Sequence, residues 1–205
     1  MQLIPPAYLL LGSGAVIAVL MMHLYMATGI TYRHRDNGLA FILFVLGVGI
    51  WNGIFVAQFL SRDPAVNQFF LSLSVVGALL AGLGWFMFAC TASSTPNIPA
   101  ERWVYAITGV LVGVAIILAI TTPVHSLFWD IDPSAPSLVA EITPMLGYWL
   151  YTGLLVGLFL GGVGLFALAW HNGDSIPYAR AYTVAGTVTV LAILASNTLV
   201  PGGLT

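Results

Sequence analysis

Long apolar segments, separated by short polar ones, follow one another along the whole chain. A helix needs about 20 apolar residues to cross roughly 30 Å of hydrocarbon, and each of these segments is at least that long. The strands of a membrane barrel would instead alternate apolar and polar residues over about ten positions. The pattern therefore predicts six membrane-spanning helices, at residues 7–32, 38–60, 66–90, 103–122, 145–170 and 178–200.

Composition supports the same interpretation. The chain is 60% hydrophobic and only 6% charged, whereas a soluble domain is typically about 25% charged. Because so few charges cannot cover a surface that faces water, we expect an all-α, polytopic transmembrane bundle in the lipid bilayer of the cell membrane, with residues 1–205 as a single domain. The net charge of −2 gives no reason to expect a nucleic-acid partner.

The arginines predict the orientation of the bundle, because basic residues in short loops stay on the cytoplasmic side. In or beside the loops after the first, third and fifth predicted helices lie Arg33, Arg35, Arg102 and Arg180, and only Arg62 lies on the opposite side. This distribution puts the N-terminus and residues 125–144 outside the cell. Six helices would leave the C-terminus outside as well, which favours a seven-helix domain cut before its last helix.

Residues 121–132, with the sequence TTPVHSLFWDID, follow the fourth apolar segment and concentrate the polar chemistry of the chain. We expect Phe128 and Trp129 to lie at the level of the lipid headgroups and the nearby acids to lie in water. The outer face would then present the groups able to sense a ligand or a signal, namely His125, Trp129, Asp130, Asp132 and Glu141.

Few polar side chains are predicted at membrane depth, where such groups need partners and often mark a pathway or a pocket. They are His23, Asn52, Gln58, Ser72, Ser74 and Asn197. For His23 the sequence leaves two interpretations open, a structural hydrogen bond and a role in coupling a ligand or signal. For the amide side chains we expect hydrogen bonds between helices.

Glycines recur at intervals of four residues in several apolar segments. Small residues at this spacing let a neighbouring helix approach closely, so that packing replaces the hydrophobic force that lipid does not supply. We expect packing within the bundle, and the alternative is a homodimer that forms through the stripe on the fifth helix. The stripes are Gly153, Gly157 and Gly161 on that helix, Gly109 and Gly113 on the fourth, and Gly49 and Gly53 on the second.

Motifs that carry enzyme chemistry do not occur in the chain. It contains no HExxH, no CxxC, no nucleophile elbow and no phosphate-binding glycine loop. The four histidines fall on different segments, and His125 with the nearby acids matches no known metal-site spacing. We therefore expect no catalysis by this chain, no metal and no cofactor.

Several loose motifs are similar to those of a known family. Residues 84–89, GWFMFA, close the third segment, and Thr121, His125 and Trp129 give the fourth a Thr-x-x-x-His-x-x-x-Trp ending. Further matches are Trp51, the run Gly147-Tyr148-Trp149, Asn197 and Pro201. In these features the chain resembles the N-terminal seven-helix membrane region of archaeal and bacterial sensor histidine kinases, the haloarchaeal kind in particular. Trp85, inside the first motif, joins the sensing candidates.

The resemblance implies an outside N-terminus, a seventh helix and cytoplasmic PAS-type and kinase modules in the full-length chain. The predicted function is a membrane-embedded sensory input domain of a two-component histidine kinase. It would detect an extracellular or intramembrane stimulus and relay it by rearranging its helices. One alternative is a small-solute channel or transporter, whose path needs Asn52, Gln58, Ser72 and Ser74 to face one another. The other is a structural membrane subunit that docks a partner through its glycine stripes.

Overall fold

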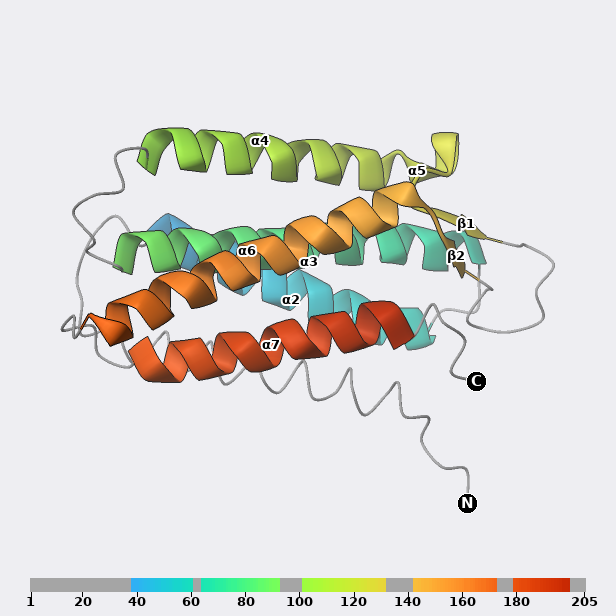
Figure 1. Cartoon of the computed structure of the whole chain (residues 1–205). Helices are drawn as coiled ribbons and strands as arrows, with labels where there is room; N and C mark the ends of the chain where they lie inside the picture. The colour runs from blue at the N-terminus through green and yellow to red at the C-terminus, as the bar shows by residue number, and fades with distance from the viewer. Residues whose placement is uncertain (1–37, 61–63, 93–100, 132–141, 173–178, 200–205) are drawn as a thin grey trace, which may run out of the picture.

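Long helices that run side by side make up most of the described chain (Figure 1). The computed structural model describes residues 38–60, 64–92, 101–131, 142–172 and 179–199. The elements are α2 (Gly38–Leu60), α3 (Pro64–Ala92), α4 (Glu101–Ile120), α5 (Thr122–His125), β1 (Trp129–Ile131), β2 (Ile142–Pro144), α6 (Leu146–His171) and α7 (Ala179–Leu199). This architecture confirms the predicted all-α bundle. The first predicted helix, residues 7–32 with His23, lies outside the described residues, as do Asp132 and Glu141.

The predicted apolar segments within the described residues are helical close to their predicted bounds. By length and apolar composition, Gln68–Thr91, Trp103–Ile120 and Leu146–His171 can each cross a bilayer, and Ile42–Ile54 and Ala179–Leu194 are shorter apolar helices. Helices suit these segments because hydrocarbon offers no partner to a backbone amide, and a helix satisfies its amides internally.

The helix α3 lies at the centre of the described bundle. It packs against α2, α4 and α6, and α7 packs against α6. In the apolar part of α3, 61% of the residues are buried, compared with 11% in α4. The α4 helix is therefore peripheral, and its exposed side chains are apolar ones, such as Trp103, Val110 and Ile117, that suit a lipid environment.

The closest helix packing in the described chain joins α2 and α3. A Cβ added at Gly77 would lie 2.6 Å from the backbone nitrogen of Trp51, and one added at Gly47 or Gly84 would also meet backbone atoms of the opposite helix. Because Cβ atoms do not approach backbone so closely, these glycines are what lets the two backbones touch. None of these glycines belongs to the four-residue stripes predicted from the sequence.

The predicted glycine stripes behave differently. A Cβ added at Gly49, Gly53, Gly109, Gly113, Gly153 or Gly157 would meet nothing within 4 Å, and only Gly161 borders a side chain, the ring of Phe86. Among the described residues these glycines therefore meet no neighbouring helix, except at Gly161, and their role in helix packing stays a prediction.

The predicted loop at residues 125–144 contains regular structure that the sequence analysis did not expect. The strands β1 and β2 form an antiparallel pair in which Trp129 lies opposite Pro144 and Asp130 lies opposite Thr143. The short helix α5 and this strand pair lie together at one end of the bundle, beside the end of α4 and the start of α6 (Figure 1). We call this end the hairpin end.

Candidate functional site

A tight corner connects α4 to β1 at the hairpin end. Pro123 lies in the first turn of α5, and Ser126, which follows the helix, has a φ of 49°, in the left-handed region. The amide of Ser126 donates to the carbonyl oxygen of Thr122 at 2.8 Å. This conformation reverses the chain direction and leaves the side chain of His125 exposed at the corner.

Both ring nitrogens of His125 have hydrogen-bond partners. The backbone amide of Leu127 donates to Nδ1 at 3.0 Å, and Nε2 lies 3.0 Å from Oγ1 of Thr121. Because Nδ1 accepts a hydrogen bond, it carries no proton, so the proton of the neutral ring is on Nε2 and is donated to Thr121. The Thr121 hydroxyl in turn donates to the carbonyl oxygen of Ile117 at 2.7 Å. The imidazole thus connects the last turn of α4 to the residues after the corner.

The residues after the corner cap the start of α6. The carbonyl oxygen of Leu127 accepts the amide of Gly147 at 2.9 Å, and that of Phe128 accepts the amide of Met145 at 3.0 Å. The first amides of a helix have no partner within the helix, so these bonds satisfy donors that would otherwise be unpaired. A Cβ at Gly147 would lie 2.9 Å from the Leu127 oxygen, which explains why this position has no side chain.

The aromatic side chains that follow His125 are buried. Phe128 is 1% exposed and Trp129 is 3% exposed, so both rings pack inside the protein, and their level in the membrane stays a prediction. The ring of Phe128 packs edge-on against Trp129 and, 6.2 Å between centroids, against Tyr151 of α6. The strand pair folds these rings back onto the bundle, and this packing across the strands was not visible in the hydropathy pattern.

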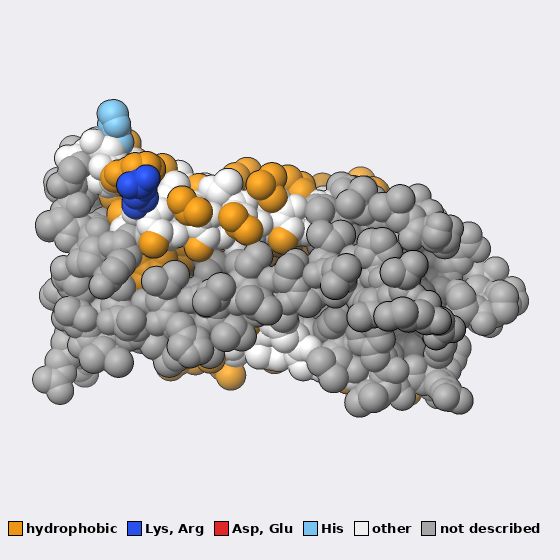
Figure 2. Space-filling model, turned by 90° about the horizontal axis from the view of Figure 1, so that it is seen from below, with side chains coloured by type: hydrophobic (Ala, Val, Ile, Leu, Met, Phe, Trp, Pro, Cys, Tyr) orange, Lys and Arg blue, Asp and Glu red, His pale blue; other side chains and the backbone are white. Residues whose placement is uncertain are grey.

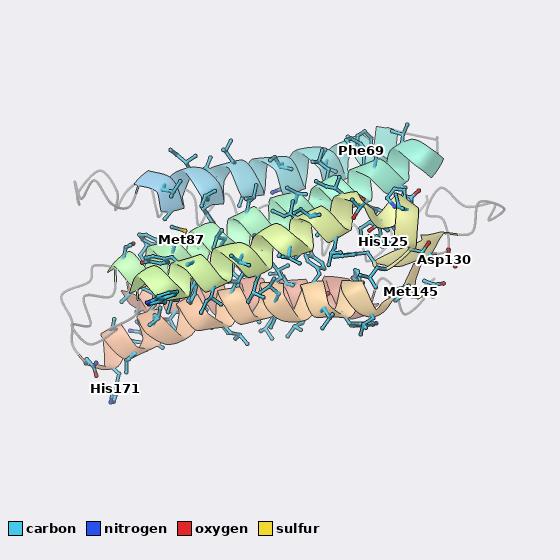
Figure 3. All side chains as sticks on the ribbon, turned by 90° about the horizontal axis from the view of Figure 1, so that it is seen from above. Phe69, Met87, His125, Asp130, Met145 and His171 are labelled. Carbon is cyan, nitrogen blue, oxygen red and sulfur yellow. The ribbon has the colours of Figure 1, made fainter. Side chains whose placement is uncertain are left out.

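The indole nitrogen of Trp129 has no hydrogen-bond acceptor in the described chain although it is buried. An unsatisfied buried donor costs about 1–3 kcal/mol, so such groups are rare in folded proteins. Asp130, the next residue, is exposed, and its contact with water stays a prediction. His125, Asp130 and Met145 lie at one end of the bundle, and His171 lies at the opposite end (Figure 3).

The other sensing candidate, Trp85, is far along α3 from this corner. It is buried among rings that four helices contribute, and its indole nitrogen donates to the carbonyl oxygen of Phe159 at 3.2 Å. The surrounding rings are Phe44 of α2, Phe88 of α3, Phe159 and Phe166 of α6, and Tyr182 of α7. Met87, two residues after Trp85, is displaced along the bundle from His125 toward its opposite end (Figure 3). The structure therefore does not bring Trp85 and His125 together.

Three of the polar side chains predicted at membrane depth, Asn52, Ser72 and Ser74, bond to their own helix. Nδ2 of Asn52 donates to the carbonyl of Val48 at 2.8 Å, and the hydroxyls of Ser72 and Ser74 donate to carbonyls of α3. This corrects the expectation that Asn52 bonds between helices, because a back-bonded amide satisfies its donor locally. The side chains of Gln58 and Asn197 lie outside the described set.

A basic side chain and a histidine lie at the left end of Figure 2, beside a strip of largely apolar side chains. Arg180 at the start of α7 lies over the ring of Trp170, 5.3 Å from the ring centroid, and His171 is exposed at the end of α6. Cations stacked on exposed indoles contribute about 0.5–1 kcal/mol. This contact joins the end of α6 to the start of α7 at the end opposite the hairpin.

Comparison with known families identifies the chain. The family described as the N-terminal 7TM region of histidine kinase matches residues 9–204. The chain belongs to this family. The match confirms the resemblance based on the motifs at residues 84–89 and 121–129. A multi-pass membrane region of a histidine kinase agrees with the apolar helices of the bundle. Searches of curated proteins and of solved structures return no match.

Part of this corner could have been found from the sequence. Thr121 and His125 are four residues apart, a spacing that brings side chains together on a helix. The contact of Leu127 and Phe128 with the start of α6 joins residues far apart in the chain, and no local pattern indicates it. Gly147 appeared in the sequence only as part of a motif, without a reason for its lack of a side chain.

Proposed function

We propose that this 7TM region is the sensory input domain of its histidine kinase and that the stimulus acts at the hairpin end. The observation that carries the proposal is the pair of backbone hydrogen bonds by which Leu127 and Phe128 cap α6. They make the position of the corner and the position of a long helix depend on each other. His125, Trp129 and Asp130 are the groups that we assign to stimulus contact.

The helix α6 is the element that carries the change along the bundle. Its first residues contact the corner, and Phe159 and Phe166 further along pack on Trp85 of α3. A rigid helix that moves at one end also moves at the other, and packed interfaces change between discrete arrangements rather than deforming continuously. A stimulus that favours one position of the corner would then favour one packing of the Trp85 rings.

The end of the bundle opposite the hairpin is where the signal would leave the membrane region. The arginine distribution supports a hairpin end outside the cell, so the opposite end faces the cytoplasm, where PAS-type and kinase modules of the full-length protein would receive the change. Homodimerisation fits the open glycines of α6, since Gly153 and Gly157 meet no described neighbour. The buried indole donor of Trp129 supports the same end as the place where a stimulus is recognised.

A comparison of two glycine substitutions on α6 tests the proposal in the full-length kinase. Gly147→Ala puts a methyl group against the Leu127 oxygen and the Phe128 ring, whereas Gly164→Ala meets nothing within 4 Å. We expect Gly147→Ala to change autophosphorylation in membranes, either its basal rate or its response to candidate stimuli. Gly164→Ala should leave it unchanged. Wild-type behaviour of Gly147→Ala, with the protein folded and inserted, would contradict a stimulus at this end.

A substitution of the indole donor gives an independent check. Trp129→Phe keeps an aromatic ring at the buried site and removes the nitrogen without an acceptor. We expect an altered autophosphorylation response, because the group that a stimulus would contact is lost. The matched control is Trp170→Phe, which changes an exposed indole at the opposite end.

A further inference from the structure

At the corner, a proton and the backbone amide of Leu127 compete for the same lone pair. That lone pair belongs to Nδ1 of His125, which accepts the Leu127 amide at 3.0 Å. We infer that the ligand of this corner is the proton: His125 binds a proton at Nδ1 and thereby releases Leu127. A role of this proton in signalling rests on the proposed function. The binding of the proton to His125 and the release of Leu127 do not depend on it.

The competition follows from the hydrogen-bonding capacity of imidazole. A neutral ring has one donor and one acceptor, and a protonated ring has two donors and no acceptor. The proton comes from water, which reaches His125 because the side chain is exposed. It adds to the Nδ1 lone pair, no covalent bond breaks, and the ring gains one positive charge. The only bond that this step removes is the hydrogen bond from Leu127.

Protonation affects the two sides of the imidazole differently. Nε2–H remains a donor, so the bond to Thr121 and the connection to α4 persist. On the other side, Nδ1–H now points at the Leu127 amide, so two donors oppose each other. Leu127 is also the residue whose carbonyl holds the amide of Gly147. The proton therefore weakens the link from the corner to α6 and leaves the link to α4 in place.

Few other groups in the described part of the hairpin end can compete for this role. Among the described residues there, Asp130 of β1 is the charged side chain, and Tyr148 and Tyr151 of α6 have titratable hydroxyls. The described parts of α3 and α4 near the corner contribute no charged or titratable side chain. Imidazole is the side chain whose charge ordinarily changes between about pH 5 and pH 8. Among the described side chains of this end, His125 is the one whose ring accepts the Leu127 amide, so proton binding there changes this hydrogen bond directly.

Three substitutions distinguish the effect of protonating His125 from the effect of losing its hydrogen bonds. His125→Asn offers Oδ1 to the amide two residues on, a bond that asparagine readily makes in turns, and cannot take up the proton. His125→Ala offers no acceptor at any pH. Thr121→Val removes the partner of Nε2 and leaves Nδ1 with its acceptor role. His171→Asn changes the exposed histidine at the opposite end and is the matched control.

The first measurement follows the ring and the amide directly. The whole 205-residue chain, with ¹⁵N-labelled histidine and leucine, is placed in lipid nanodiscs and studied by NMR from about pH 8 to pH 5. The His125 signals, assigned by their loss in His125→Asn, should show an Nδ1 without a proton at the high end and with one at the low end. Protection of the Leu127 amide from hydrogen exchange, corrected for intrinsic pH effects, should fall roughly fivefold over the same range, the factor for one ordinary hydrogen bond.

The second measurement follows the distance between α5, at the corner, and α6. Spin labels at Val124→Cys and Leu150→Cys lie on exposed positions of α5 and α6, and the native Cys90 is buried. We expect one narrow distance distribution at high pH and a broader one in acid. His125→Asn should stay narrow, and His125→Ala should be broad at every pH. Thr121→Val and His171→Asn should both retain the acid response.

Different results would contradict the proton site and the proposed sensory function. A proton on Nδ1 at high pH, an acid response that persists in His125→Asn, or Leu127 protection that is unaffected by ring protonation would each overturn the proton site. If the corner responds as expected but autophosphorylation of the full-length kinase ignores both pH and Gly147→Ala, the proton site stands and the sensory role at this end fails.

Discussion

The indole nitrogen of Trp85 donates to the backbone carbonyl of Phe159 across the interface between α3 and α6, at 3.2 Å. The two rings also stack, with their centroids 6.2 Å apart. In a membrane, where lipid gives no hydrophobic force between helices, such packing and hydrogen bonding hold helices together. Trp85 is therefore a positioning residue for the bundle. The movement that we propose for α6 would change the packing of α6 against the Trp85 ring.

Replacing Trp85 by phenylalanine removes this donor and part of the ring volume. We expect the free energy of unfolding to fall by about 1–3 kcal/mol, from one lost hydrogen bond and a small cavity. Thermal unfolding of the purified chain in a single detergent, followed by circular dichroism, measures the change. Trp103→Phe, at a position that is 73% exposed on α4, is the control. Equal losses in the two variants would contradict a special role for Trp85.

Alanine at Gly77 should push α2 and α3 apart. Its Cβ would lie 2.6 Å from the Trp51 nitrogen and 2.9 Å from the Gly47 oxygen. Forcing extra volume into a packed interface typically costs about 1–3 kcal/mol, and we expect a loss in this range in the same unfolding assay. Gly49→Ala on α2 meets nothing within 4 Å and should be neutral or slightly stabilising, since alanine favours helix more than glycine does. The prediction fails if Gly49→Ala is the more damaging change.

Truncating Phe128 should loosen the hairpin end. The side chain is almost fully buried against Trp129 and Tyr151, and removal of a buried phenylalanine ring costs about 3–5 kcal/mol. For Phe128→Ala we expect faster hydrogen exchange of the amides of Met145 and Gly147, measured by mass spectrometry, with the far end of α6 less affected. Val124→Ala, at a neighbouring position that is 87% exposed, should leave this exchange unchanged. Uniformly faster exchange along all helices would instead indicate global unfolding.

Cysteine labelling in intact cells tests the orientation. Asp130 and His171 are exposed at opposite ends of the bundle. With a membrane-impermeant thiol reagent, Asp130→Cys should react from outside, because the arginines predict that the hairpin end is external. His171→Cys should react only after the membrane is opened. The buried Cys90 of the unsubstituted chain gives the background, and the reverse pattern of labelling would refute an outside N-terminus.

The contact between Thr121 and His125 could be predicted from the sequence, whereas the contact by which the corner caps α6 could not. The spacing of four residues is local information, and helical geometry converts it directly into a side-chain contact. The contact between Leu127 and Gly147 depends on a chain reversal and a strand pair, so it is a property of the folded chain. The burial of Trp129 has the same origin.

Hydropathy by itself determined where the helices lie, because any long apolar segment in a membrane has to satisfy its own backbone amides. It did not determine which face of each helix points inward. Gly157 meets nothing in the described chain and Gly162, on the same helix, lies against the indole of Trp85. Lipid and protein interior are equally apolar, so the two glycines look alike in the sequence. Only the tertiary structure, by placing a ring beside one of them, decides which is a contact.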